Sequence, residues 1–387
     1  MKPTNSHFAR YGATIFDTMS RLAREKQAIN LGQGLPEGGE PADIVARAAE
    51  ALTGRSNQYP PMLGLPELRQ AVARHDRDFY GLDLDWQRET MVTSGGTEAL
   101  AAALLALIEP GDEIVVFEPL YDSYLPIIER AGGVPRVVRL QPPDWRIPAA
   151  ALEAAFGPRT KLVLFNSPMN PTAKLFDEAD LALIARLMTQ HDCYAICDEV
   201  YEHLVFDGAR HVPLITLPGM RARTVRIGSA GKTFSLTGWK VGYISACPAL
   251  IDQIVRAHQF LVFTTPPNLQ IAVAYGLSKE PEYFADFARG MQAKRDLLVA
   301  GLERAGFAVA PCAGTYFVNV EVASVGFDGD DVAFCRDIIE RAGVAAIPVS
   351  AFYASEPETR FVRFCFAKPE PMLDEAMARL HRRFGRN

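Results

Sequence analysis

Short apolar runs alternate with helical patterns through most of this 387-residue chain, and this alternation restricts its fold more than any other feature. From about residue 45 to 280, apolar residues at helical spacing separate runs that have the length of single strands. Strands joined by helices form parallel sheets with helices on both faces. We therefore expect an α/β protein with a mainly parallel sheet of seven strands, at residues 90–93, 113–117, 134–139, 161–165, 193–197, 224–228 and 241–246.

The two ends of the chain show shorter elements. A short helix is expected at Ala13–Lys26, followed by a loop rich in glycine and proline. After a long helix at about 281–305, the pattern changes to short strands at 315–321, 344–347 and 360–365 and helices at 330–341 and 369–383. This mixture predicts α+β structure at the C-terminal end.

Composition and charge exclude several classes of protein. Acidic and basic residues are interleaved and give a formal net charge of −6, so no nucleic-acid partner is expected. No apolar run approaches the ~20 residues of a membrane-spanning helix, so no membrane span is expected. The first residues lack the apolar core of a secretory signal, which makes the cytoplasm the expected location. The six cysteines form no Cys-x-x-Cys pair, so no metal site is expected.

Polar clusters follow three of the predicted strands, at the point where each strand ends. Ser94–Thr97 follows the strand at 90–93, Asn166–Thr172 follows the strand at 161–165, and Asp198–Tyr201 follows the strand at 193–197. Open α/β sheets bind their ligands at the carboxyl ends of the strands. We therefore expect these clusters to meet in one binding site.

Lys232 lies on a turn between the predicted strands at 224–228 and 241–246, among hydroxyl residues and glycines. A lysine held between two buried strands suits Schiff-base chemistry, in which its amine attacks a carbonyl carbon. A solvated loop lysine would have a similar local sequence. The polar clusters that follow the other predicted strands favour the interpretation of Lys232 as a reactive amine.

These motifs, in their order along nearly the whole chain, resemble those of the class I/II aminotransferases, enzymes of fold type I that use pyridoxal phosphate. The resemblance is greatest to the methionine and the kynurenine/glutamine aminotransferases, through Leu31–Pro36, Asn57–Tyr59, Asp198–Leu204 and Arg363–Phe366. One position departs from the pattern, because Ala173 stands where the family usually has glycine. The resemblance implies three parts. Residues 1–44 would form an N-terminal arm that belongs to the small α+β domain, residues 45–285 would form the large cofactor domain, and residues 286–387 would form the small C-terminal domain.

The resemblance also assigns residues to the cofactor ring. Lys232 would be joined to the cofactor and would carry a proton between the substrate α-carbon and the cofactor. Asp198 would keep the ring nitrogen protonated, although the same carboxylate could instead cap a turn. Tyr201 and Asn170 would hold the ring hydroxyl. Tyr121 would stack on the ring face, or alternatively pack in the core.

The cofactor phosphate needs backbone N–H groups at a helix N-terminus together with cations and hydroxyls. Gly95, Gly96 and Thr97 would supply the N–H groups, at the start of a helix expected at 98–108. Ser229 and Lys240 resemble the side-chain ligands of the family.

A substrate carboxylate is best bound by a planar cation that donates two parallel hydrogen bonds, and Arg363 is the candidate. Alternatively, Arg363 could form an ion pair inside the protein. Gly34 would let the backbone approach the same carboxylate. Asn170 is also expected to contact the substrate, and Phe16 and Phe263 are expected beside the substrate side chain. By the resemblance, Tyr59 and Phe263 would reach the site from a neighbouring subunit, which implies a homodimer.

The function that these residues favour is transfer of the amino group of methionine or an aromatic amino acid to a 2-oxo acid by a ping-pong mechanism. The main alternative is a kynurenine/glutamine aminotransferase with β-lyase activity on cysteine conjugates, which would use the same residues. A regulatory module of the same fold would carry a DNA-binding domain. With about 30 residues before the first cofactor-side helix, no such domain is expected.

Overall fold

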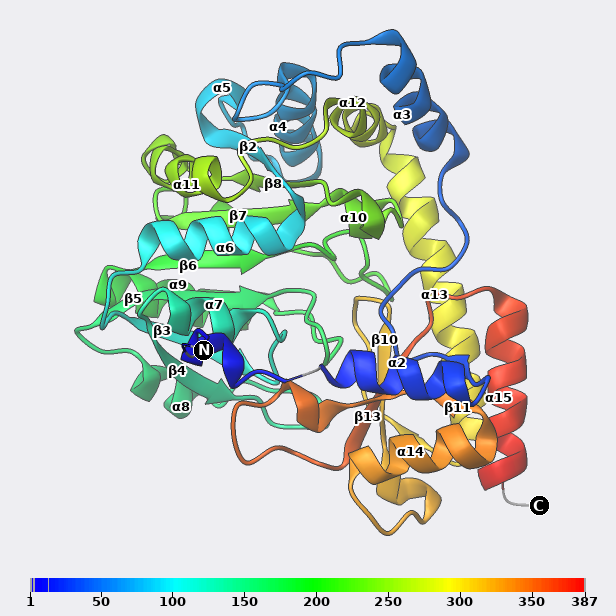
Figure 1. The fold of residues 1–387 in the computed structure, drawn as a ribbon. Helices are drawn as coiled ribbons and strands as arrows, with labels where there is room; N and C mark the ends of the chain where they lie inside the picture. The colour runs from blue at the N-terminus through cyan, green and yellow to red at the C-terminus, as the bar shows by residue number, and fades with distance from the viewer. Residues whose placement is uncertain (1, 3, 13, 386–387) are drawn as a thin grey trace.

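The structure is a computed structural model that describes residue 2, residues 4–12 and residues 14–385. Seven strands form the large sheet, in the order β2-β8-β7-β6-β5-β3-β4 (Figure 1). Each strand begins and ends within one residue of its predicted run: β2 (Thr90–Thr93), β3 (Glu113–Glu118), β4 (Val134–Arg139), β5 (Thr160–Asn166), β6 (Tyr194–Asp198), β7 (Thr224–Ser229) and β8 (Gly242–Ser245).

The large sheet is mainly parallel, as predicted, with one strand reversed. The neighbouring pairs from β4 to β7 are parallel, whereas β8 runs antiparallel to both β2 and β7. The connection between β7 and β8 holds two short helical turns, α10 (Ala230–Thr233) and η2 (Thr237–Trp239), instead of a long helix that crosses the sheet. The chain therefore reverses direction there. As a result, the Lys232 turn lies at the same edge of the sheet as the carboxyl ends of β5 and β6.

Helices cover both faces of this sheet because alternate strand residues point to opposite sides. Ile114 and Val116 pack with α6 (Gly95–Leu107), α7 (Tyr124–Arg130) and α11 (Pro248–Leu261). Val115 and Phe117 pack with α8 (Ala149–Ala155) and α9 (Glu178–His191). The end formed by β2 and β8 packs against α3 (Ala42–Gly54), α4 (Pro66–Tyr80) and α12 (Pro267–Leu277). None of the helices in the described part of the chain is long and apolar enough to cross a membrane.

The C-terminal part contains a second, antiparallel sheet in the order β12-β13-β10-β9. Its strands are β9 (Ala308–Val309), β10 (Phe317–Glu321), β12 (Ile347–Pro348) and β13 (Phe361–Cys365). Helices that pack around this sheet (Figure 1) are α2 (Ile15–Glu25), α13 (Pro281–Arg304), α14 (Asp331–Ala342) and α15 (Glu370–Phe384). The helix expected from position 13 is seen from Ile15, and position 13 itself lies outside the described residues.

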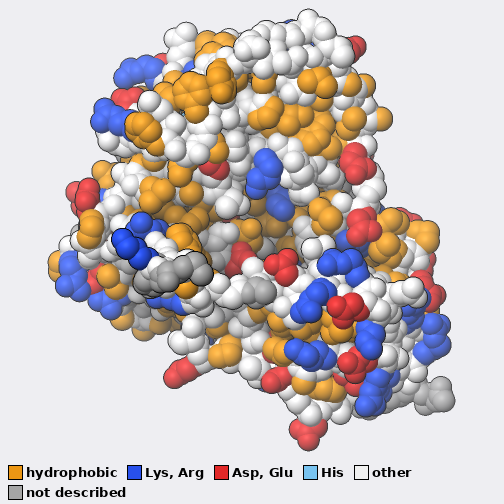
Figure 2. Space-filling view, in the orientation of Figure 1, with side chains coloured by type: hydrophobic (Ala, Val, Ile, Leu, Met, Phe, Trp, Pro, Cys, Tyr) orange, Lys and Arg blue, Asp and Glu red, His pale blue; other side chains and the backbone are white. Residues whose placement is uncertain are grey.

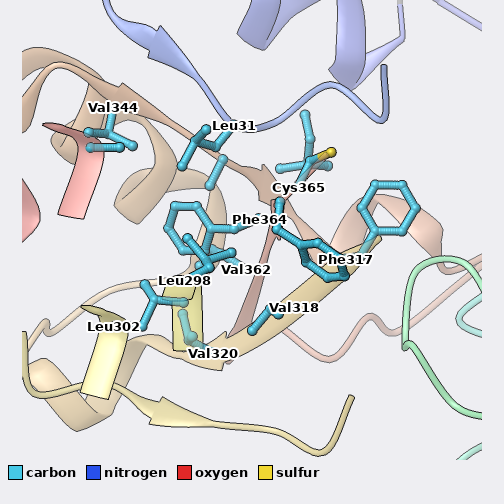
Figure 3. Close-up of a cluster of buried hydrophobic side chains, with 14 of the residues drawn as sticks. Leu31, Leu298, Leu302, Phe317, Val318, Val320, Val344, Val362, Phe364 and Cys365 are labelled. Atoms are coloured by element: carbon cyan, nitrogen blue, oxygen red, sulfur yellow. The ribbon is translucent and has the colours of Figure 1, made fainter. Parts of the chain in front are cut away.

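The N-terminal segment is part of the same packing unit as the second sheet. Strand β1 (Ile29–Asn30) pairs in parallel with β11 (Val344–Ala345). Leu31 lies in one buried cluster with Leu298, Phe317 and Phe364 (Figure 3). This packing fixes the start of the loop that contains Gly34.

The predicted domain limits fall inside continuous helices. The limit at 44/45 lies within α3 and the limit at 285/286 lies within α13, which runs from the large sheet to the second sheet (Figure 1). The three-part division therefore stays a prediction. The remaining helical turns are α1 (Ser6–Ala9), α5 (Trp86–Glu89), η1 (Leu214–Thr216), η3 (Val322–Val325) and η4 (Val349–Phe352).

Candidate active site

A cavity of about 390 Å³ lies where β5, β6 and β7 end and where β10 and β13 of the second sheet approach. Figure 2 shows the hollow on this face of the molecule. The last residues of the three strands, Asn166, Asp198 and Ser229, all line it. Most of the predicted site residues line it too: Phe16, Gly34, Gly95, Gly96, Thr97, Tyr121, Asn170, Asp198, Tyr201, Ser229, Lys232, Lys240 and Arg363.

Asn166 ties the ends of two strands together, a function that the sequence did not indicate. Its Nδ2 donates to the backbone oxygen of Asp198 over 2.7 Å, and its Oδ1 accepts from the backbone N–H of Asn170 over 2.7 Å. Ala173 has a φ of 61°, the left-handed conformation that glycine favours. The alanine therefore has a glycine-like backbone here, and the turn keeps Asn170 at the cavity.

Asp198 presents a buried carboxylate oxygen to which no described residue donates a hydrogen bond. The residue is 5% exposed, its Oδ2 accepts from the Tyr124 hydroxyl over 2.7 Å, and its Oδ1 has no partner among the described residues. Burial raises the pKa of Asp198 to about 6, while the bond from Tyr124 and the positive charge of Lys232 oppose this rise. A buried acceptor without a donor costs free energy. The cavity therefore offers Oδ1 to a cationic N–H group.

The amine of Lys232 lies between aromatic rings. Its Nζ donates to the hydroxyl of Tyr316 over 3.0 Å and lies 5.7 Å and 5.6 Å from the ring centroids of Tyr201 and Tyr316. The short helix α10 presents this lysine at the carboxyl end of β7. The amine is thus held at the cavity, as a covalent role requires.

Arg363 is a buried cation with hydrogen-bonding capacity to spare. It is 1% exposed, and burial lowers its pKa to about 10, so it keeps its charge at neutral pH. Its Nη1 donates to Asn170 Oδ1 over 2.5 Å and its Nη2 to the oxygen of Gly32 over 3.0 Å, while Nε has no partner among the described residues. The guanidinium carbon lies 3.8 Å from the ring centroid of Phe317. These partners are neutral, so the positive charge is available to a ligand carboxylate.

The opposite part of the cavity suits an anion. Helix α6 begins at Gly95, so Gly95, Gly96 and Thr97 form its first turn, and all three line the cavity. The first N–H groups of a helix have no partner within the helix, so they are available to a ligand. Gly95 has a φ of 79°, which favours glycine, and a Cβ there would lie 3.5 Å from Lys240 Nζ. A helix N-terminus beside a lysine and the Ser229 hydroxyl attracts a phosphate.

These features fit pyridoxal phosphate. The α6 end supplies phosphate donors, and the unpartnered oxygen of Asp198 matches a protonated ring nitrogen. The amine of Lys232 lines the same cavity. The residues present therefore suit this cofactor.

Two predicted site residues lie outside the cavity. Tyr59 is 82% exposed and its ring lies 5.5 Å from that of Phe263, which is 41% exposed. Neighbouring Phe260 is 85% exposed. Within one chain these aromatic side chains therefore form an exposed group rather than a wall of the site.

Several residues at the site were not predicted. Tyr124 and Tyr316 bond to Asp198 and Lys232, and Asp122 lines the cavity. The only signal for Tyr124 was its position three residues after Tyr121, where α7 begins. Tyr316 had no signal, because it is brought to the site by the packing of β10.

A buried ionic cluster supports the turn that carries Asp198 and Tyr201. Arg226 of β7 is fully buried and donates to Asp76 over 2.7 Å, to Glu199 over 2.6 Å and to Glu202. Glu199 and Glu202 lie on either side of Tyr201 in the sequence. Arg226 therefore fixes this turn to β7.

Comparison with known proteins agrees with this geometry. The sequence model of the family described as aminotransferase class I and II matches residues 26–380. The chain is 40% identical to a methionine aminotransferase of Escherichia coli K12, covering 97% of each chain. It is 42% identical to a probable N-succinyldiaminopimelate aminotransferase of Mycobacterium tuberculosis, covering 97% of this chain and 98% of that one. It is 36% identical to human kynurenine–oxoglutarate transaminase 1, covering 91% and 92%.

Solved structures show the same similarity. An Escherichia coli structure, for which a methionine aminotransferase function was identified, superposes with a TM-score of 0.96 at 40% identity, covering 99% of this chain and all of that one. The structure of the N-succinyldiaminopimelate aminotransferase of Mycobacterium tuberculosis gives a TM-score of 0.95 at 42% identity, covering 98% and 99%. The predicted fold type is thereby confirmed.

Proposed function

The chain belongs to the class I and II aminotransferases, which work with pyridoxal phosphate, and we propose that it transfers the amino group of methionine or an aromatic amino acid to a 2-oxo acid. The names of the methionine and kynurenine relatives support this choice. The observation that carries it is the charge of the cavity. Among the described residues its cations are Lys232, Lys240 and Arg363, and each has a proposed partner in the cofactor or the α-carboxylate. The described lining therefore holds no further cation for an acidic side chain.

The chain's own residues provide the acid–base chemistry. Bound pyridoxal phosphate supplies an electron sink for the negative charge that develops at the substrate α-carbon. Asp198 Oδ1 would accept from the protonated ring nitrogen, because a carboxylate beside that nitrogen favours its protonated form. Tyr201 and Asn170 would hold the ring hydroxyl. Lys232 Nζ would take the proton from the substrate α-carbon and pass it to the cofactor carbon, and in the second half-reaction it would move a proton in the opposite direction.

Arg363 orients the substrate through its free edge. In the described part of the chain Nε has no partner, and Nη2 uses one hydrogen for Gly32, so these two nitrogens can bind both oxygens of the α-carboxylate. Gly34 lies beside this position, where a Cβ would come within 2.6 Å of the Phe317 ring. Phe16 and Phe317 give the cavity an apolar wall. An apolar or aromatic side chain suits that wall.

The assembly and location belong to the same proposal. Tyr59, Phe260 and Phe263 form an exposed aromatic surface, and such surfaces are commonly covered in an interface. We infer a homodimer in which Tyr59 reaches the neighbouring subunit's phosphate and Phe263 its substrate. Analytical ultracentrifugation at micromolar concentration is expected to show a dimer, and a monomer with full activity would contradict the inference. A cytoplasmic location stays a prediction from the sequence.

A donor panel tests the proposed substrate. Purified enzyme with pyridoxal phosphate is given each amino acid and a 2-oxo acid, and kcat/KM is measured, with Lys232→Ala as the inactive control. Methionine, phenylalanine and tyrosine are expected to exceed aspartate and glutamate by at least about 100-fold, since a buried unpaired carboxylate costs several kcal/mol. Preference for aspartate or for N-succinyldiaminopimelate would refute the assignment.

A second assay, run without an acceptor, distinguishes the β-lyase alternative from amino transfer. Cysteine conjugates are supplied without any 2-oxo acid acceptor, and pyruvate is measured. Steady pyruvate release faster than amino transfer from methionine would favour the alternative. A transaminase needs the acceptor to regenerate its starting form, so it would stop after one turnover.

A further inference from the structure

Lys232 is linked to the loop at Gly34 through one tyrosine hydroxyl. Lys232 Nζ donates to the Tyr316 hydroxyl over 3.0 Å, and that hydroxyl donates to the backbone oxygen of Gly34 over 2.9 Å. A carbonyl oxygen can only accept, so the hydroxyl proton of Tyr316 is directed to Gly34 and its lone pairs face the lysine. Burial raises the pKa of Tyr316 well above its ordinary value, which keeps the hydroxyl protonated. The direction of both bonds is therefore fixed.

Packing holds the Tyr316 ring in place. The residue is fully buried, and its ring meets the rings of Tyr201 and Phe317 edge-on, with centroids 5.2 Å and 4.7 Å apart. Tyr316 directly precedes β10, where Asn319 is paired with Arg363 of β13. The hydroxyl is thus carried by the same rigid sheet as the proposed carboxylate-binding arginine.

Buried side chains fasten the Gly34 loop at three points. The backbone oxygens of Gly32, Gly34 and Leu35 accept from Arg363, Tyr316 and Lys368, over 3.0, 2.9 and 3.0 Å. Of these three donors, Tyr316 is the one that also contacts Lys232. It therefore joins the substrate side of the cavity to the reactive amine.

We propose that Tyr316 is a positioning residue for Lys232. Its hydroxyl holds the free amine of Lys232 between the Tyr201 ring and the Gly34 loop. This inference rests on the proposed function, because it requires Lys232 to be the reactive amine. Tyr316 acts through the lysine and not on the substrate. Arg363 and Lys368 still fasten the Gly34 loop when the Tyr316 hydroxyl is lost, so the effect is on how readily the amine reacts, with little effect on how tightly ligands bind.

The test compares the wild type with Tyr316→Phe, which removes only the hydroxyl. Capture of pyridoxal phosphate by the cofactor-free enzyme is expected to slow about tenfold, the effect of losing one hydrogen bond at the amine. The affinity for 4-deoxypyridoxine phosphate, which has the ring and phosphate but no aldehyde, is expected to stay within about twofold. With methionine, kcat is expected to fall about tenfold while KM stays within about twofold.

Tyr353→Phe is the matched control, because the Tyr353 hydroxyl is buried without a partner among the described residues. It is expected to change none of these quantities. Unchanged capture and kcat in Tyr316→Phe would overturn the proposal. So would an equal loss of affinity for the analogue, which would show a purely structural role. Failure of the wild type to capture the cofactor would instead refute the proposed function itself, so the two failures are distinguishable.

Discussion

Replacing Asp198 with asparagine is expected to stabilise the cofactor-free protein while it weakens the cofactor site. The folded protein holds the Asp198 proton more tightly than the unfolded chain, since burial raises its pKa from 3.8 to about 6. An acid with a raised pKa makes the folded state lose stability as pH increases from about 4 to above 6. A difference of about two pH units corresponds to about 3 kcal/mol at pH 8, and to roughly half of that at pH 5.

Asparagine removes this cost because it has no charge and keeps an oxygen for the Tyr124 hydroxyl. Urea unfolding of cofactor-free wild type and Asp198→Asn should therefore show a gain in free energy of unfolding of about 3 kcal/mol at pH 8 and roughly half at pH 5. With pyridoxal phosphate present the order should reverse, because the variant no longer holds the ring-nitrogen proton.

The exposed Asp252 provides the control, since its replacement by asparagine should change stability by less than about 0.5 kcal/mol. Asp198→Asn could prove no more stable than the wild type at pH 8, or the difference in stability could be the same at both pH values. Either result would refute the claim that the buried Asp198 carboxylate destabilises the cofactor-free protein.

Three further changes test other parts of the site. Arg363→Ala should raise the KM for methionine about 100-fold and leave cofactor affinity within about threefold, and an unchanged KM would contradict its carboxylate role. Gly34→Ala should raise KM at least about tenfold, because its Cβ would meet Phe317, and steady-state kinetics measures this. Arg226→Met should lower the free energy of unfolding by about 3–5 kcal/mol, against less than about 1 kcal/mol for the exposed Arg136→Met, as denaturant titration would show.

Most strands of the large sheet were predictable because strands buried on both faces are largely apolar runs. In β3 and β5, residues 114–117 and 162–165 are apolar and all buried. The direction of β8 was not predictable, since an apolar run has the same composition whichever way it is traversed. It follows from the short connection through α10 and η2, which becomes clear only in the structure.

The site was predictable to the extent that its residues follow strand ends. Asp198 and Lys232 occupy such positions, so the sheet topology brings them together. Tyr316 reaches Lys232 from 84 residues away, and Tyr124 reaches Asp198 from 74 residues away. Those contacts depend on how β10 and α7 pack, and no local pattern encodes that packing.

The most direct test of the account is to identify the residue that is joined to pyridoxal phosphate. The purified holoenzyme is reduced with borohydride, digested, and its peptides are mapped by mass spectrometry. The account predicts one phosphopyridoxyl group per chain, attached to Lys232 and absent from Lys232→Ala. A label on another lysine, or none on protein that is saturated with the cofactor, would contradict it.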